Sequence, residues 1–156
     1  IREMDQLGML IDLTHMVEAS FWDALDLARW PVAATHGNAR SLRDTVRYLT
    51  DEQIRAIAST GGIICPSPMP LGPGDEVPSL DNVLNHIDYM VDLVGPEYVG
   101  FGTDFLGQTK CRPAGFSDIS ESRNLIEGLL ERGHALEVVC KIMGGNFMRV
   151  FRAVTG

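Results

Sequence analysis

Short apolar runs alternate along the chain with longer segments that repeat apolar residues at helical spacing. The runs cover residues 9–13, 31–35, 62–65 and 98–103, with the sequences MLIDL, PVAAT, GIIC and YVGFGT. Continuous apolar runs of this length are typical of strands that are covered on both faces. The pattern therefore predicts four buried strands.

Amphipathic segments separate and follow these runs. Thr50 is a suitable N-cap for the stretch TDEQIRAIASTGG, which has acidic residues in its first turn and ends at Gly61, so we predict a helix there. Ser79 opens another helix, with an apolar stripe that runs to Val94. Further helices are predicted over residues 19–28, 118–132, 136–142 and 145–154, and the Pro/Gly-rich residues 66–78 are predicted to form a long loop near the site.

The order of these elements predicts an α/β fold. Strands and helices that alternate with a repeat of about 20 to 40 residues indicate parallel strands joined by right-handed crossovers. Four such units make half of an eight-stranded (β/α)8 barrel. An open four-stranded sheet has the same local pattern, so the pattern alone leaves both architectures open.

Composition and charge narrow the range of partners. The 156 residues are 45% hydrophobic, which is enough to bury a core as one domain or as a piece of a larger one. The formal net charge is −8, and no block of Lys or Arg is present, so no nucleic-acid partner is expected. No apolar run reaches the roughly eighteen residues of a membrane helix, so we predict no transmembrane segment.

The first residue, Ile1, stands inside a helix-like segment, IREMDQLG, so we expect residues upstream of it. This leaves the compartment of the parent protein open, with a cytoplasmic location favoured for the chain itself. The three cysteines, Cys65, Cys111 and Cys140, are odd in number and form no C-x-x-C pattern. We therefore expect reduced thiols rather than a disulfide framework or a thiolate zinc site.

Side chains that can carry chemistry follow three of the four predicted strands. His15, His36 and Asp104 each come just after an apolar run and a threonine. Because the carboxyl ends of parallel strands meet at one edge, we expect these side chains to converge. Two imidazoles and a carboxylate can form a metal site, for which Zn²⁺ is well suited, or an acid–base site. Spacing does not decide whether Asp104 binds metal or transfers a proton, and the chain supplies too few ligands for a complete site.

The other two histidines have positions that are typical of structural or solvent-facing residues. His86 lies within an amphipathic helix, and His134 follows Gly133 in a turn. Arg47, considered by itself, is a loop arginine with no local sign of a role in binding.

Five longer stretches resemble the renal, or membrane, dipeptidase family of zinc metallopeptidases. They are GMLIDLTHMVEASFWDAL, PVAATHGNARSL, RYLTDEQIRAIASTGG, NHIDYMVDLVGPEYVGFGTDF and GGNFMRVF, and they occur in order over essentially the whole chain. The resemblance implies that residues 1–156 are the C-terminal half of a (β/α)8 TIM-type barrel whose N-terminal half is absent.

The resemblance also implies an activity and a set of site residues. It implies hydrolysis of a dipeptide or a related small amide at two Zn²⁺ ions bridged by a glutamate and a hydroxide. His15 and His36 match the family's ligands to the second zinc. Asp104 matches the catalytic aspartate, and Arg47 matches the arginine that pairs with the substrate carboxylate.

The chain departs from the family pattern in two ways. Leu106, in GTDFLG, stands where the family motif has a second aspartate, which puts the substrate preference in question. The family's early His-x-Asp motif, its bridging glutamate and a further substrate-facing histidine all precede the matching region. We therefore expect one zinc or none in this chain alone, and catalysis only after the missing half completes the site.

Two alternatives to a hydrolase half remain open. The first is a non-catalytic half-barrel that self-associates or binds metal weakly. A half-barrel exposes two edge strands and an apolar inner face, so a homo-oligomer is expected in either case. The second, an unrelated phosphate-binding α/β domain, is disfavoured because no G-x-x-x-x-G-K-[ST] loop occurs.

Overall fold

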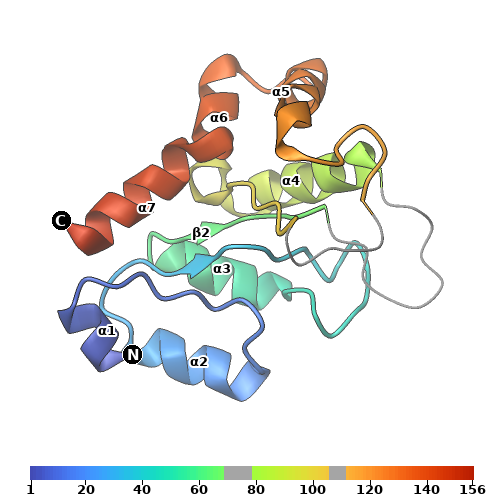
Figure 1. Cartoon of the computed structure of the whole chain (residues 1–156). Coiled ribbons are helices and arrows are strands. Elements are labelled where there is room, and N and C mark those ends of the chain that lie inside the picture. The colour runs from blue at the N-terminus through green and yellow to red at the C-terminus, as the bar shows by residue number, and fades with distance from the viewer. Residues whose placement is uncertain (69–78, 106–111) are drawn as a thin grey trace.

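The computed structural model describes residues 1–68, 79–105 and 112–156 (Figure 1). The α-helices are α1 (Arg2–Gln6), α2 (Glu18–Leu27), α3 (Asp51–Ser59), α4 (Leu80–Val94), α5 (Ser122–Glu131), α6 (Leu136–Cys140) and α7 (Asn146–Thr155). The strands are β1 (Ala33–Ala34) and β2 (Ile63–Ile64). Three short helical segments complete the order, η1 (Pro96–Tyr98), η2 (Ile119–Glu121) and η3 (Lys141–Gly145).

The four predicted strand segments lie in parallel and in chain order. Strands β1 and β2 form a two-stranded parallel sheet. A parallel bridge between Asp12 and Ala33 adds the segment that precedes β1, and another between Ile64 and Val99 adds the segment that follows β2. This order confirms the α/β class, whereas closure of the segments into half of a barrel stays a prediction.

The strands are shorter than predicted. The runs at 31–35 and 62–65 contain two-residue strands, and the runs at 9–13 and 98–103 form single bridges instead of strands. The two outer segments each pair with one neighbour among the described residues, so one side of each has no ladder partner there. The apolar pattern therefore located the segments correctly and overestimated their regular pairing.

Alternate side chains of the extended segments enter two separate cores. Six face the main cluster, which also includes residues of α2 to α6: Ile11, Leu13, Val32, Ala34, Ile64 and Val99. Three face the opposite way and pack with Val150 of α7: Ala33, Ile63 and Cys65. All nine are at most 3% exposed, so the prediction that both faces are covered is confirmed.

The helix ends agree with the capping patterns in the sequence. Thr50 Oγ1 accepts a hydrogen bond from Gln53 N, and the Gln53 side chain accepts one from Thr50 N, which is a capping box at the start of α3. Ser79 and Asn82 form the same arrangement at the start of α4. The predicted helix 118–132 is divided into η2 and α5, and the last two predicted helices meet at a kink at Gly144, where φ is 146°.

Helices α2 to α6 contribute to the main cluster, and α7 packs on the opposite face of the extended segments. In Figure 1, α1 and α2 lie beside the first extended segment and α4 to α7 lie toward the last one. Helix α3 packs against β2 and α4, and α7 also packs against β2. Most of the predicted long loop, residues 69–78, lies outside the described residues. In the described part of the chain, no helix combines the length and apolar character needed to cross a bilayer.

Candidate functional site

The three residues singled out by the strand-end pattern lie together at one edge of the parallel segments. His15 Nε2 is 2.9 Å from His36 Nε2, and the two rings meet edge to face with 4.8 Å between their centroids. Asp104 Oδ2 is 3.8 Å from His36 Nε2. The structure thus brings both imidazoles and the carboxylate to a common point.

Two of these three residues have an uncommon backbone conformation. His15 has φ 66° and Asp104 has φ 46°, and they are the only non-glycine residues with positive φ in the described ranges. Side-chain-bearing residues rarely adopt this left-handed region, and such strained positions cluster at functional sites. The chain turns sharply after each extended segment, and this turn directs the side chain to the shared edge.

A close backbone approach at Gly102 positions Asp104. A Cβ atom at Gly102 would overlap the carbonyl oxygen of Thr35, so only glycine permits this contact. The same Cβ would also stand 3.3 Å from the Cβ atom of Cys65, the residue that follows β2. The role of Gly102 was not predicted from the sequence, although a glycine inside a predicted strand is a known sign of close backbone approach.

Arg47 reaches the histidine pair from the loop before α3. Its guanidinium Nη2 is 3.2 Å from His15 Nδ1. Because a guanidinium can only donate, His15 Nδ1 is the acceptor in this contact. The structure therefore places Arg47 beside the histidines, which its local sequence gave no reason to expect.

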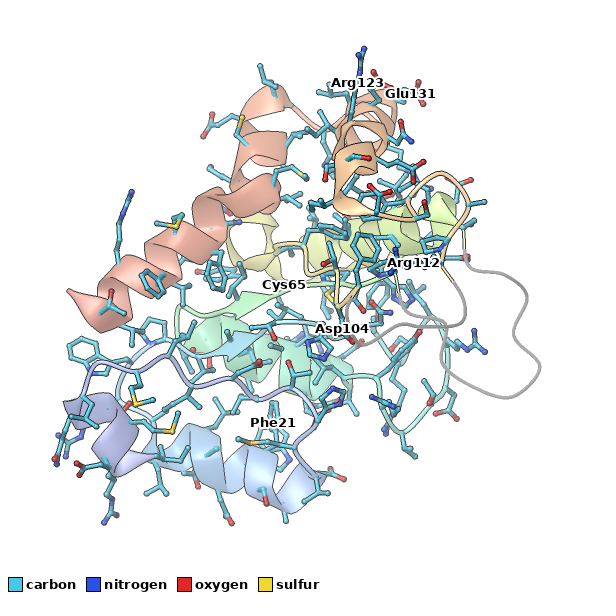
Figure 2. All side chains as sticks on the ribbon, in the orientation of Figure 1. Phe21, Cys65, Asp104, Arg112, Arg123 and Glu131 are labelled. Atoms are coloured by element: carbon cyan, nitrogen blue, oxygen red, sulfur yellow. The ribbon has the colours of Figure 1, made fainter. Side chains whose placement is uncertain are left out.

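A cavity of about 490 Å³ opens beside these residues. Its wall includes His15, His36 and Arg47, and Phe21 of α2 contributes an apolar surface (Figure 2). This volume falls in the range of small-molecule pockets, which combine apolar walls with a few polar groups. The site can therefore enclose a small ligand next to the two imidazoles.

Asp12 forms a polar anchor of the site that was not predicted from the sequence. Its carboxylate accepts hydrogen bonds from the backbone N and hydroxyl of Thr14 and from the backbone N and hydroxyl of Thr35. Burial opposes its ionisation, but these hydrogen bonds outweigh burial and hold the pKa of Asp12 below its usual value. The available signal was the sequence MLIDL, which places an aspartate inside an apolar run.

The surroundings of His15 favour the neutral ring. Burial lowers the pKa of His15, and the neighbouring His36 and Arg47 lower it further. Asp104 and Asp12 raise it by a smaller amount. Neutral imidazole is the form that binds a metal ion, so this environment suits a ligand histidine.

The remaining histidines have partners outside this site. His86 is buried, and its Nδ1 accepts a hydrogen bond of 3.2 Å from Ala39 N. Burial lowers the pKa of His86 to about 4, with a further contribution from Arg43. His134 Nε2 is 2.7 Å from Asp88 Oδ1 on α4. Both contacts are structural, in line with the interpretation from the sequence.

The described cysteines are free thiols, as the sequence predicted. Cys65 is buried, and burial raises the pKa of its thiol to about 12, whereas Cys140 is exposed. Cys111 and Leu106 lie outside the described residues.

His15 and His36 fit part of a metal site. Two imidazole nitrogens bound to one tetrahedral Zn²⁺ lie about 3.3 Å apart, close to the 2.9 Å between the two Nε2 atoms. No group of three or more His, Cys, Asp or Glu residues within residues 1–68, 79–105 and 112–156 is arranged to hold a metal ion. A catalytic zinc site uses three protein ligands, whereas the described residues bring together two imidazoles and the nearby Asp104 carboxylate as candidates.

Parallel segments whose carboxyl ends gather imidazoles, a carboxylate and a cavity define an α/β protein of the kind that keeps its chemistry at the strand ends. Residues 1–156 match the membrane dipeptidase family, peptidase family M19, and the chain belongs to that family. This membership confirms the resemblance seen in the sequence.

Curated relatives are considerably longer than this chain. Dipeptidase tcpJ of Claviceps purpurea is 35% identical over 156 residues, which cover 99% of this chain and 36% of the relative. An uncharacterized protein in the pqqA 5′ region of Klebsiella pneumoniae is 35% identical over 159 residues, with 99% and 58% covered. The chain therefore spans roughly a third to three-fifths of the relatives it matches.

Solved structures of similar proteins are also longer than this chain. The probable dipeptidase PvdM from Pseudomonas aeruginosa superposes with a TM-score of 0.90 at 25% identity, covering 98% of this chain and 52% of that one. A metallo peptidase from Rhodobacter sphaeroides, liganded with a phosphinate mimic of the dipeptide L-Ala-D-Ala, has a TM-score of 0.86 at 25% identity, with 97% and 44% covered. The chain is thus similar to about half of each structure.

Proposed function

We propose that residues 1–156 are the C-terminal half of a zinc-dependent dipeptidase barrel and that the protein completed by an N-terminal half hydrolyses dipeptides. The observation that carries this proposal is the convergence of His15, His36 and Asp104 in a chain of the membrane dipeptidase family. The fraction of the solved relatives that the chain covers, 52% and 44%, supports the half-barrel assignment.

His15 and His36 would hold one of two Zn²⁺ ions through their Nε2 atoms, which requires His15 to give up its contact with Arg47 and to carry its proton on Nδ1. The missing half would supply the remaining ligands. When bound, zinc makes hydroxide available near neutral pH and polarises the scissile carbonyl. The low pKa of His15 keeps its ring ready for this role over a wider range of pH.

Asp104 would act as the proton carrier. Its carboxylate lies beside the Nε2 atom of His36, at the edge where the substrate carbonyl would be attacked. From there it would accept a proton from the attacking water and pass it to the leaving amine. This role requires a carboxylate that is close to the metal ligands without being one of them.

Arg47 would hold the carboxylate at the C-terminus of the substrate. A guanidinium binds a carboxylate through two parallel hydrogen bonds, which fixes a short substrate in register. The cavity of about 490 Å³ has room for a small substrate. The phosphinate mimic of L-Ala-D-Ala in the Rhodobacter sphaeroides relative supports a substrate of two residues.

Arg47→Ala is expected to raise KM for dipeptides about 10- to 100-fold, since a charge-assisted contact contributes about 1.5–3 kcal/mol. Turnover should change little, because the contact is similar in the ground and transition states. Steady-state kinetics with a dipeptide and with its C-terminal amide would measure the effect. The KM for the C-terminal amide should change little. Arg47→Lys keeps the positive charge without the two parallel N–H donors, so its KM for dipeptides should lie between the values of the unmodified enzyme and Arg47→Ala. An equal loss on the amide would reject the role.

Zinc analysis combined with a dipeptide hydrolysis assay tests the whole proposal. The two proteins to compare are this chain and the chain extended upstream in its own reading frame. We expect two zinc ions and hydrolysis in the extended protein, and one ion or none without hydrolysis in this chain. An extended protein that binds zinc and cleaves no dipeptide would overturn the proposed activity.

A second candidate is a non-catalytic half-barrel that self-associates or binds metal weakly. It is favoured by the finding that the described residues contain no group of three metal ligands. In that case both proteins in the experiment above would be inactive and would bind zinc weakly or not at all, and sedimentation would show a homo-oligomer of this chain.

A further inference from the structure

Asp12 is linked to His36 through the hydroxyl of Thr35 and is not part of the cavity wall. Its two carboxylate oxygens have different partners. Oδ1 accepts from the backbone N and hydroxyl of Thr14 and from the backbone N of Thr35. Oδ2 accepts from the hydroxyl of Thr35, with 2.5 Å between the two oxygens. The hydroxyl of Thr35 in turn lies 3.1 Å from His36 Nδ1.

The donor and the acceptor of each hydrogen bond in the series Asp12–Thr35–His36 follow from the chemistry of these groups. An ionised carboxylate can only accept, so the single hydroxyl proton of Thr35 is used on Asp12. Oγ1 of Thr35 is then left as an acceptor toward His36, and Nδ1 of His36 must carry the proton. A neutral imidazole has one proton, so the lone pair of His36 is on Nε2.

The opposite end of the site leads to the same assignment independently. The guanidinium of Arg47 donates to His15 Nδ1, so the proton of the neutral His15 ring is on Nε2. That Nε2–H points at His36 Nε2, 2.9 Å away, which must therefore accept. Both ends require the tautomer of His36 with a proton on Nδ1.

We infer that Asp12 is a positioning residue: acting through Thr35, it fixes His36 in the tautomer that leaves Nε2 free to bind a metal ion. The inference rests on the proposed function only in taking His36 as the ligand. Partners of the second nitrogen of a ligand histidine hold its tautomer and ring orientation, and losing them typically weakens metal binding about 10- to 100-fold. Asp12 acts here through an intervening hydroxyl.

Asp12→Asn is expected to exchange donor and acceptor in the hydrogen bonds that join residue 12, Thr35 and His36, so it tests the inference directly. The three donors around Oδ1 retain the amide oxygen at that position, so the amide nitrogen faces Thr35 and donates to its hydroxyl. The freed hydroxyl proton of Thr35 then points to His36 Nδ1. The proton of the ring moves to Nε2, where it opposes metal binding.

Two measurements on this chain report the outcome. Long-range proton–nitrogen NMR spectra, recorded at pH about 8 where ordinary imidazoles are neutral, assign the tautomer of His36 without any metal. Titration calorimetry with Zn²⁺ measures affinity. We expect the Nδ1–H form in the unmodified chain and the Nε2–H form in Asp12→Asn, with zinc affinity about 10- to 100-fold lower.

Thr35→Val and Thr14→Val form a matched pair of controls. Each removes one hydroxyl that binds Asp12. The hydroxyl of Thr35 contacts the His36 ring, whereas the hydroxyl of Thr14 accepts a 3.4 Å hydrogen bond from the His36 backbone N and does not contact the ring. Thr35→Val should leave a mixture of tautomers and reduce zinc affinity, whereas Thr14→Val should keep both properties unchanged. Circular dichroism on each variant identifies any that fails to fold. The remaining variants then show whether the tautomer of His36 depends on Asp12 and Thr35.

The inference is overturned if His36 keeps one tautomer in the unmodified chain, Asp12→Asn and Thr35→Val alike, or if Thr14→Val changes it as much as Thr35→Val does. The tautomer measurement separates this result from a failure of the proposed function. A chain that shows the expected tautomers and binds no Zn²⁺ would support the role of Asp12 in orienting the ring and contradict the zinc assignment of His36.

Discussion

His36→Ala in the completed protein is expected to lower kcat/KM for a dipeptide by about 10³-fold or more. The variant loses a proposed zinc ligand, and Lewis-acid stabilisation of the transition state contributes several kcal/mol, with each 1.36 kcal/mol equal to a tenfold rate. His15→Ala should have a similar effect, because its Nε2 lies 2.9 Å from that of His36. Steady-state kinetics and zinc analysis on the same preparations would measure both losses.

The double variant of His15 and His36 should be little worse than either single variant, because ligands of one ion act as a unit. His134→Gln is a suitable control, since His134 contacts Asp88 on α4 and not the site. It should keep full zinc content and activity. Near-normal turnover with two bound zinc ions in either ligand variant would contradict the assignment.

Asp104→Asn is expected to reduce kcat by about 10²- to 10⁴-fold while zinc content and KM change little. Removing a general acid–base group has an effect of this size, because an amide cannot take up and release the proton. Asparagine tolerates the left-handed backbone at this position, where φ is 46°, so the fold should be preserved. The measurement is the pH profile of kcat together with the zinc content.

This experiment also resolves the choice that spacing in the sequence leaves open at Asp104. If the carboxylate were a metal ligand, Asp104→Asn would lose zinc together with activity. If it carries the proton, zinc remains bound and the limb of the pH profile that depends on the carboxylate disappears. Full activity with normal zinc content would exclude both roles.

Much of the fold could be predicted from local patterns. The capping boxes at Thr50 and Ser79 and the apolar stripe of α4 depend on residues within one or two turns, so the sequence shows them directly. The four extended segments were located because burial on both faces produces apolar runs. The number of paired residues in each segment depends on hydrogen bonds to distant neighbours, and an apolar run carries no information about them.

The candidate site was partly visible for a related reason. The shared edge of parallel strands predicted that His15, His36 and Asp104 converge, and they do. The position of Arg47 near His15 was suggested only by the family resemblance, because a loop arginine has no periodicity to interpret. Asp12 was missed because its importance lies in hydrogen bonds to Thr35, twenty-three residues away in the sequence.

The left-handed backbone at His15 and Asp104 lowers the stability of the folded protein at two residues of the candidate site. Conformations of this kind raise the free energy of the folded state by about 1–3 kcal/mol per residue, and glycine would relax both positions. An imidazole and a carboxylate are nevertheless present, so the folded state is less stable than it would be with glycine at these two positions. The burial of apolar residues such as Ile64 and Val99, which are fully enclosed in the core, offsets this loss of stability.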